Sequence, residues 1–276
     1  MQKSGQNVIQ KKADEFWRMK QNILRNEEVA PGIFRMSVVG WEEIQSAFPG
    51  QFLHVRCSTT FDPLLRRPFS IHDANSNEVK ILYKVIGSGT KLLSEKKAGE
   101  ELDIIGPLGH GFSVEPPPES VLIVAGGIGI APMLFLARFV KASRKQVLIG
   151  ARTGELILYE EEFKKLGCSV EVTTDDGSYG SKGQVSALFK EFLKRQAPTT
   201  VYACGPVALL KEIADTCSSY NIRCELSLEN QMGCGVGACL GCVIEIKLKD
   251  NGIIYKRVCR EGPVFDANTV SWENLI

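Results

Sequence analysis

Apolar and polar residues alternate in short segments from about residue 26 to residue 116, and turn residues separate these segments. Residues 32–39, 51–55 and 79–85 each show a period of two, which is typical of strands with one buried face. Short strands that follow one another in this way predict a small antiparallel barrel. The prolines at positions 116–118 then predict a stiff linker, because proline fixes its backbone angle and donates no hydrogen bond.

The pattern changes after these prolines, where continuous apolar strands alternate with helices. The expected strands are residues 121–124, 146–150, 169–174, 200–203 and 225–228, and the expected helices are residues 131–141, 159–166, 185–194 and 207–220. Strand–helix alternation predicts a doubly wound parallel sheet. We therefore expect a β + α/β chain with an N-terminal extension at 1–25, an antiparallel barrel at 26–116, an α/β domain at 117–226 and a small C-terminal subdomain at 227–276.

The charge composition argues against partners that bind through a bulk electrostatic field. The 276 residues include 33 Lys and Arg against 32 Asp and Glu, which gives a formal net charge of +1. Such a balance favours neither nucleic acid nor an anionic membrane surface. Glycines and a proline interrupt the longest apolar run, residues 121–137, and residues 1–25 contain no long apolar stretch. We therefore expect no membrane span, no export signal and a cytoplasmic location.

Four of the nine cysteines lie close together near the end of the chain. Cys234, Cys239 and Cys242 have the spacing Cys-x4-Cys-x2-Cys among several glycines, and Cys259 follows. Thiolates are soft ligands that hold iron and sulfide, and glycine permits the tight turns with which a short loop wraps a cluster. The pattern predicts a [2Fe-2S] cluster. A structural zinc site is the alternative, although it usually has two Cys-x2-Cys pairs, whereas an odd cysteine count speaks against a disulfide framework.

The segment 66–70 carries groups that suit a flavin nucleotide. It reads Arg-Arg-Pro-Phe-Ser and resembles the Arg-x-Tyr/Phe-Ser signature of the ferredoxin-reductase-like flavoproteins. Arginine can bind a phosphate, an aromatic ring can lie against the flavin, and a hydroxyl can bond to the flavin ring. The glycines of Gly87-x-Gly89-Thr90 would let amides approach a pyrophosphate, although an ordinary hairpin turn also accounts for them. The expected FAD-binding residues are Arg67, Pro68, Phe69, Ser70, Tyr83, Lys84, Val85, Gly89 and Thr90.

A glycine-rich turn in the α/β segment suits a dinucleotide. Gly126, Gly127 and Gly129 lie between an expected strand and an expected helix. At that position backbone amides and the helix N-terminus face a pyrophosphate. We therefore expect these glycines to bind NAD.

Two further loops lie at the ends of later strands, where open parallel sheets bind ligands. One is Cys204-Gly205-Pro206, for which a buried free thiol before a turn is the alternative reading. The other begins at Asp175, whose carboxylate would repel a 2′-phosphate and favours NAD over NADP. A solvated Asp-Gly turn is equally consistent with that loop, and Arg152 could instead accept a phosphate.

Together these motifs resemble the electron-transfer subunits of NAD-dependent dihydroorotate dehydrogenases, which pair with a separate FMN-containing catalytic subunit. The matching segments are residues 65–71, 126–129, 173–180, 232–239 and 257–265, of which the final two are the most specific. The resemblance implies two copies of each chain in the complex. It also implies an electron route in pyrimidine biosynthesis, from dihydroorotate through FMN on the partner to [2Fe-2S], FAD and NAD+ on this chain.

In that family the residue equivalent to Cys204 lies beside the nicotinamide, so Cys204 is the expected catalytic residue. The base that oxidises dihydroorotate is expected on the partner. One alternative is an FAD and iron–sulfur NAD(P)H reductase subunit of a hydrogenase or of a bifurcating ferredoxin:NADP reductase. A second, from another class, is a zinc-stabilised nucleotide-binding module without a redox role.

Overall fold

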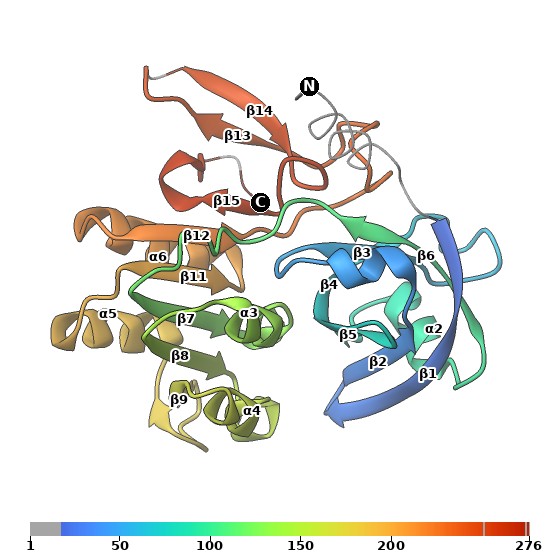
Figure 1. Cartoon of the computed structure of the whole chain (residues 1–276), viewed down its shortest axis with the longest axis horizontal. Helices are drawn as coiled ribbons and strands as arrows, with labels where there is room; N and C mark the ends of the chain where they lie inside the picture. Colours follow the sequence, from blue (N-terminus) through green and yellow to red (C-terminus); the bar gives the residue numbers. More distant parts are fainter. Residues whose placement is uncertain (1–17, 251, 274, 276) are drawn as a thin grey trace, which may run out of the picture.

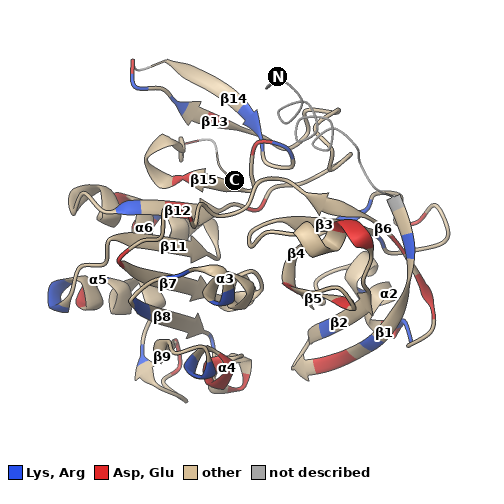
Figure 2. Cartoon of the chain, viewed as in Figure 1, with Lys and Arg blue, Asp and Glu red and all other residues tan. Residues whose placement is uncertain are grey.

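The computed structural model describes residues 18–250, 252–273 and 275. A barrel lobe and a sheet lobe lie side by side, and the C-terminal segment lies along the top of both (Figure 1). Basic and acidic residues are interspersed over the two lobes (Figure 2). Within the described ranges, no helix has the length and apolar character needed to cross a membrane.

Six strands form a closed antiparallel barrel in the order β1-β2-β5-β4-β3-β6. They are β1 (Arg18–Ala30), β2 (Ile33–Val39), β3 (Phe52–Arg56), β4 (Arg67–Ala74), β5 (Glu78–Lys84) and β6 (Glu101–Leu108), with the short helices η1 (Glu42–Ser46) and α2 (Ser88–Glu95) between them. Successive side chains of a strand point to opposite faces. In β3, Leu53 and Val55 pack inside the barrel, whereas Phe52 joins a separate core outside it.

The barrel begins earlier than the sequence indicates. β1 pairs with β6 from Arg18 opposite Ile105 to Asn22 opposite Glu101, so residues 18–25 belong to the barrel and not to the expected extension. Ile23 is the one buried residue among residues 19–30, so β1 lacks the apolar alternation that reveals a strand. The rest of the expected extension, residues 1–17, lies outside the described residues.

A seven-stranded sheet forms the second lobe in the order β10-β9-β8-β7-β11-β12-β15. Its strands are β7 (Ser120–Gly126), β8 (Arg144–Ala151), β9 (Ser169–Thr174), β10 (Ser181–Lys182), β11 (Thr200–Cys204), β12 (Arg223–Ser227) and β15 (Val264–Asp266). Every neighbouring pair is parallel except β12 with β15. The predicted doubly wound sheet is confirmed, with one antiparallel strand added at its edge.

Helices cover both faces of this sheet. α5 (Val185–Arg195) and α6 (Val207–Ser219) pack on one face, and α3 (Met133–Phe139) and α4 (Glu160–Lys165) pack on the other. The helix expected at 131–141 is α3, which is shorter at both ends. The tighter helix η2 (Gly127–Ile130) lies before it, and Pro132 directly precedes its first residue. A second short helix, η3 (Gly154–Leu156), follows β8.

The C-terminal segment does not form a separate body. It contains the hairpin β13 (Val243–Lys247) and β14 (Ile253–Arg257), then β15 and the short helix η4 (Ala267–Thr269). One hydrophobic core contains Phe52 of the barrel, Leu226 of the sheet, and Cys259 and Phe265 of this segment. The residues before and after position 226, where we expected a domain limit, therefore share one hydrophobic core.

This shared core predicts that the C-terminal segment unfolds together with the sheet lobe. Phe265 is 6% exposed, and Phe265→Ala should lower the free energy of unfolding by about 3–5 kcal/mol, because it leaves a cavity where the parts meet. Urea denaturation followed by circular dichroism should show one transition at lower urea. Tyr255→Ala, at a residue that is 67% exposed in β14, is the control and should change little. A separate early transition confined to the C-terminal segment would contradict a shared core.

Candidate functional site

Backbone amides surround the thiols of the cysteine loop. The amides of Ala238, Cys239 and Val236 donate to Cys234 Sγ at 3.2, 3.4 and 3.5 Å. The amide of Gly241 donates to Cys239 Sγ at 3.4 Å, and the amide of Cys259 donates to Cys242 Sγ at 3.4 Å. Such donors favour the thiolate form, which is the form that binds metal. The loop therefore already presents its sulfur atoms as ligands.

The four thiols form two pairs. Burial alone would raise the pKa of Cys234, but the amides of Val236 and its neighbours, together with the Cys239 thiol, outweigh burial and lower this pKa to about 6. In the other pair, burial and then the Cys242 side chain raise the pKa of Cys259 to about 12. In the described part of the chain, no three His, Cys, Asp or Glu side chains are grouped closely enough to hold a metal ion. Four cysteine thiols, of which Cys234, Cys239 and Cys242 accept hydrogen bonds from backbone amides, are nevertheless the donor set that an iron–sulfur cluster uses.

Arg257, the last residue of β14, supports the cysteine loop. Arg257 Nη1 donates to the carbonyl of Gly237 at 2.7 Å, and its guanidinium also pairs with the carboxylate of Glu261. The amide of Val258 donates to the carbonyl of Cys242 at 2.9 Å, which ties the fourth cysteine to the third. The predicted metal ligands Cys234, Cys239, Cys242 and Cys259 thus belong to one braced structure.

The two arginines of the flavin motif have different surroundings. Arg66 bonds to Asp103 through Nη1 to the carbonyl at 2.9 Å and through Nη2 to Oδ1 at 2.8 Å, so it has a structural role. Arg67 Nη1 donates to the carbonyl of Leu65 at 2.8 Å, and within the described residues it has no carboxylate partner. A Cβ placed on Gly89 would lie 3.6 Å from Arg67 Nε. The fold thus brings Arg67 and the Gly87–Thr90 turn together, as a pyrophosphate site requires.

Two of the expected flavin residues use their side chains inside the protein. Thr90 Oγ1 accepts from the amides of Ile86 and Gly87 at 3.0 and 3.2 Å, which shapes the start of α2. Tyr83 is 1% exposed and donates to Asn26 Oδ1 at 3.0 Å, so its phenol cannot face a ligand. Phe69 packs against the Tyr83 ring, with 5.6 Å between the centroids.

Other expected flavin residues lie closer to the surface. Pro68 and Ser70 on β4 are half-buried, Lys84 at the end of β5 is exposed, and Val85 is half-buried. The amide of Val85 is occupied, because it donates to the carbonyl of Gly32 at 2.8 Å. Side-chain contacts with a flavin are therefore more open to Arg67, Pro68 and Ser70 than to Phe69, Tyr83 and Thr90, which are buried.

The glycine-rich turn and the Cys204 turn are in direct contact. A Cβ on Gly129 would lie 2.3 Å from the carbonyl oxygen of Cys204, so only glycine permits this approach. A Cβ on Gly205 would lie 3.2 Å from Gly126 Cα. β7 and β11 are neighbours in the sheet, and Ala125 lies opposite Cys204. The two predicted dinucleotide segments therefore form one edge of the sheet, as expected for a doubly wound fold.

Cys204 is a buried thiol with an acidic neighbour. Burial, and then the nearby Glu229 carboxylate, raise the pKa of Cys204 to about 12, so the thiol is neutral. Glu229 is exposed to solvent. The atoms packed around its carboxyl group nevertheless raise the pKa of Glu229. Sequence reasoning missed Glu229, because a single acidic residue after a strand carries no recognisable signal. A neutral Cys204 can contact a ligand but does not act as a thiolate nucleophile.

The loops after β8 and β9 are joined to each other. The amide of Gly154 donates to Ser178 Oγ at 2.8 Å, and Asp176 Oδ1 accepts from the Ser178 amide at 2.9 Å. The amide of Asp175 donates to the carbonyl of Ala151 at 3.0 Å, and residue 175 is exposed. Of the two aspartates, Asp175 is the one whose carboxylate is not used by the loop itself.

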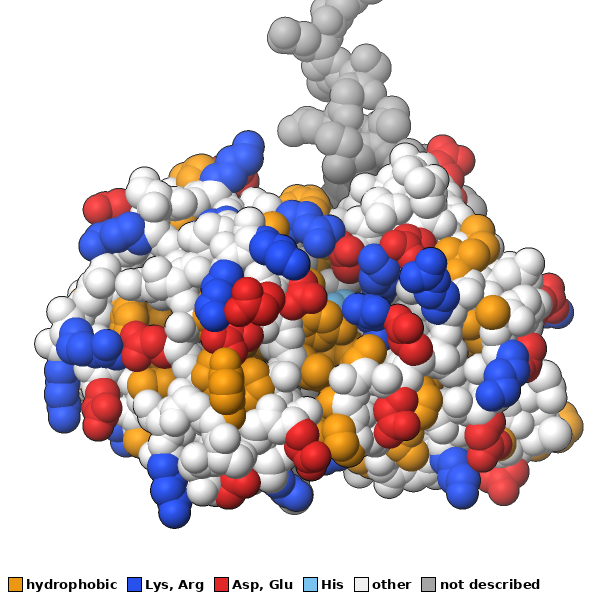
Figure 3. Space-filling model, turned by 90° about the horizontal axis from the view of Figure 1, so that it is seen from below, with side chains coloured by type: hydrophobic (Ala, Val, Ile, Leu, Met, Phe, Trp, Pro, Cys, Tyr) orange, Lys and Arg blue, Asp and Glu red, His pale blue; other side chains and the backbone are white. Residues whose placement is uncertain are grey.

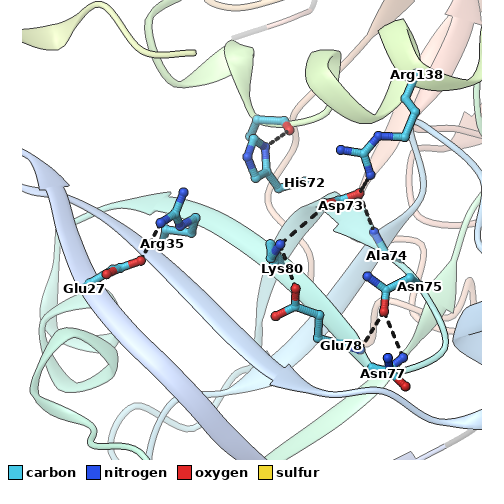
Figure 4. A network of polar contacts seen from close by, with 11 residues as sticks. Glu27, Arg35, His72, Asp73, Ala74, Asn75, Asn77, Glu78, Lys80 and Arg138 are labelled. Carbon is cyan, nitrogen blue, oxygen red and sulfur yellow. Dashed lines mark hydrogen bonds and ion pairs between the residues drawn. The ribbon is translucent and has the colours of Figure 1, made fainter. Parts of the chain in front are cut away.

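A polar network fixes the barrel against the sheet lobe (Figure 4). Asp73 on β4 pairs with Arg138 on α3 and with Lys80 on β5, the latter at 3.6 Å. His72 Nδ1 lies 2.7 Å from the carbonyl oxygen of Ala131. Hydrophobic side chains gather in the hollow between the lobes, and charged ones flank them (Figure 3). This contact holds the flavin motif on β4 beside the glycine-rich turn after β7.

His54 is a second residue that sequence reasoning missed. It is 0% exposed in β3, opposite Pro68 of β4. A Cβ on Gly235 would lie 2.2 Å from His54 Nδ1, so the imidazole lies against the cysteine loop. Burial, and then the charge of Arg66, lower the pKa of His54 to about 4, which makes the ring neutral. A lone histidine in an apolar strand gives no signal of such a contact.

Comparison with known proteins places these features in a family. A family model described as the iron–sulfur cluster binding domain of dihydroorotate dehydrogenase B matches residues 229–271. A model described as an oxidoreductase NAD-binding domain matches residues 123–215. The first match falls on the cysteine loop and the second on the glycine-rich turn and the Cys204 strand. The iron–sulfur match explains the cysteines in place of the zinc-stabilised module.

Whole-chain relatives agree with these matches. The chain is 42% identical over 249 residues to the electron transfer subunit of dihydroorotate dehydrogenase B (NAD(+)) from Desulforamulus reducens, covering 89% of this chain and 95% of that protein. It is 42% identical over 255 residues to the corresponding subunit from Caldanaerobacter subterraneus subsp. tengcongensis, covering 92% and 98%.

The fold is also similar to solved structures. The structure of the NADH-dependent reduced ferredoxin-NADP oxidoreductase, studied for flavin-based electron bifurcation, superposes with a TM-score of 0.81 at 27% identity, over 92% of this chain and 91% of that chain. The ferredoxin reductase in carbazole 1,9a-dioxygenase shares the fold, with a TM-score of 0.63 at 16% identity over 75% of this chain and 67% of that chain. With the cysteine loop, the nucleotide motifs and the extent of the identity in agreement, this chain belongs to the oxidoreductase family of electron transfer subunits of NAD-dependent dihydroorotate dehydrogenase B.

Proposed function

We propose that this subunit carries electrons from the FMN of a dihydroorotate dehydrogenase catalytic subunit through a [2Fe-2S] cluster and FAD to NAD+. The observation that carries the proposal is the contact between His54 and Gly235, which joins the cysteine loop to β3, the neighbour of the flavin-motif strand β4. In this proposal, three binding regions follow one another across a single chain. FAD supplies the exchange between one-electron and two-electron transfer that a cluster and a nicotinamide require.

Each group of residues has one task in this proposal. Cys234, Cys239, Cys242 and Cys259 would hold the iron, and the amides on Cys234 Sγ would stabilise its thiolate. Arg67 and the amides near Gly89 would bind the FAD pyrophosphate, with Pro68, Phe69 and Ser70 at the flavin. The turn at Gly126, Gly127 and Gly129 and the Cys204-Gly205-Pro206 turn would hold the dinucleotide.

The finer features of the complex belong to the same proposal. Two copies of each chain would assemble, as the resemblance implies. The exposed Asp175 favours NAD over NADP, because a carboxylate repels a 2′-phosphate. None of the nine cysteines is joined in a disulfide, which suits the reducing cytoplasm.

The test is an assay of the assembled complex. Purified with its natural catalytic partner, the chain should let dihydroorotate reduce NAD+ to NADH, whereas the isolated chain should reduce dyes with NADH but leave dihydroorotate unchanged. Oxidation of dihydroorotate by the isolated chain would contradict these roles.

A second candidate is the NAD(P)H reductase subunit of a bifurcating ferredoxin:NADP reductase, which the TM-score of 0.81 with such an enzyme favours. The same assay separates the two functions. A flavin-loaded complex that ignores dihydroorotate and reacts with ferredoxin would support the second function and refute the first.

We predict that Cys239→Ser removes the cluster and leaves the flavin in place. Cys239 is exposed in the cysteine loop, far in the sequence from the FAD motif, and serine is a poor ligand for iron in such a cluster. Iron and sulfide content should fall, while FAD content and NADH-to-dye activity persist. Cys168→Ser, at a buried thiol outside the loop, is the control and should keep its iron. Loss of FAD from Cys239→Ser would show that the two sites are not independent.

We predict that Arg67→Ala weakens FAD binding first. Loss of a charge-assisted phosphate contact costs about 1.5–3 kcal/mol, or roughly 10- to 150-fold in the dissociation constant. FAD retained after gel filtration, read from the flavin absorbance, measures the effect. Arg56→Ala is a matched control on β3, because its guanidinium donates to the carbonyl of Thr60 at 3.4 Å and, among the described residues, has no carboxylate partner. Equal FAD retention in the two variants would show that Arg67 does not bind the pyrophosphate.

A further inference from the structure

The position of His54 is unusual for a polar side chain on the wall of a barrel. Its neighbours Leu53 and Val55 face the barrel interior, so His54 points outward with Phe52. The outward face of a barrel strand is ordinarily open to solvent, yet His54 is 0% exposed. The C-terminal segment covers it, because Phe52 shares a core with Cys242 and Cys259.

The contact with the cysteine loop is direct. Residue 235 has a φ of +72°, and a Cβ there would lie 2.2 Å from His54 Nδ1 and 2.7 Å from Cε1. The imidazole therefore lies on the bare backbone of Gly235, next to the ligand Cys234. A side chain at residue 235 would separate the loop from β3.

The ring is polar, but its nitrogens lack ordinary partners. Neither Nδ1 nor Nε2 makes a hydrogen bond of normal geometry within the described residues. The carbonyls of Cys234 and Arg66 lie close enough to favour a proton on the ring. A neutral imidazole has a single N–H, so it can serve one of these carbonyls at a time. An apolar side chain would fill the same space without burying unsatisfied nitrogens, and such groups in native proteins call for an explanation.

We propose that His54 is a positioning residue for electron transfer between the cluster and the flavin: its imidazole holds the cysteine loop at Gly235 against the strand pair that carries the flavin residues. On the barrel side, Arg66 Nη1 donates to the His54 carbonyl at 3.4 Å, and His54 lies opposite Pro68 of the flavin motif. His54 thus contacts Gly235, next to Cys234, through its ring and the flavin-motif segment through its backbone. The histidine itself gains and loses no electron and no proton. The inference rests on the proposed function, because it assigns the two carriers to the two regions that His54 joins.

The test compares two rates in the complete complex with its catalytic partner. NADH-to-dye reduction needs only the flavin, whereas dihydroorotate-to-NAD+ transfer also crosses the junction between cluster and flavin. His54→Phe fills the space but has no N–H, and it should lower the second rate relative to the first by about 10- to 100-fold, since small misplacements have effects of this size. The electron paramagnetic resonance spectrum of the reduced cluster should also shift. His54→Asn, which retains a donor near the position of Nδ1, should keep most of the rate and the wild-type spectrum.

Met36→Leu is the matched control, because Met36 is a fully buried side chain of the same barrel that packs in the barrel core. It should leave the ratio of the two rates and the spectrum unchanged. An unchanged ratio and spectrum in His54→Phe would overturn the inference. So would a fall of both rates together with FAD loss, because that result would assign His54 to the flavin site alone.

A double-mutant cycle covers the case in which His54→Phe fails to assemble. Gly235→Ala should disturb the spectrum and the ratio when His54 is present, and it should do so less in a His54→Ala chain, where the new methyl group has room. Backbone strain at residue 235 is common to both backgrounds and cancels in the cycle. Strictly additive effects would refute the contact. If the wild-type complex did not transfer electrons from dihydroorotate, the proposed function would fail, whereas the spectra of the variants reduced with dithionite would still decide the role of His54.

Discussion

The antiparallel pairing of β15 with β12 is the constraint on which the arrangement of the three binding regions depends. Glu225, Leu226 and Ser227 pair with Asp266, Phe265 and Val264, which fixes the returning chain to the sheet. The amide of His110 donates to the carbonyl of Gly262 at 2.6 Å, which fixes the same chain to the end of the barrel lobe. Cys259 lies just before this double attachment. The fourth cysteine is therefore placed by the sheet and the barrel, and the other three lie in the glycine-rich loop.

The polar contact between the lobes is a second constraint, and it acts on a different side of the barrel. Asp73 and His72 on β4 meet Arg138 and the Ala131 carbonyl of the sheet lobe. β4 thus carries the flavin motif at one end and the lobe contact at the other. The covered outer face of the neighbouring β3 meets the cysteine loop. The barrel wall around the flavin motif therefore contacts both the sheet lobe and the cysteine loop.

The sequence was sufficient for the features that have a local signal. Strand–helix alternation predicted the sheet lobe, with residues 169–174 matching β9 at both ends, and the cysteine spacing predicted the loop that the family model matches. The early start of β1 was missed because only Ile23 of its described side chains is buried. β15 was missed because three residues have no periodicity, and its place in the sheet comes from pairing with β12. The binding of FAD by Tyr83 and Thr90 stays a prediction, and hydrogen bonds to Asn26 and to the Gly87 turn engage their side chains.

The surroundings of Cys204 limit what the dinucleotide edge can do. Burial keeps this thiol protonated, and the Glu229 carboxylate nearby opposes a second negative charge. A thiolate is the reactive form of cysteine, so the fold suppresses nucleophilic attack at the place where a nicotinamide ring is expected. The contact of Gly129 with the Cys204 carbonyl fixes the backbone of that turn as well. A neutral surface would suit hydride transfer involving a nicotinamide held there, because that chemistry depends on position and needs no acid or base from Cys204.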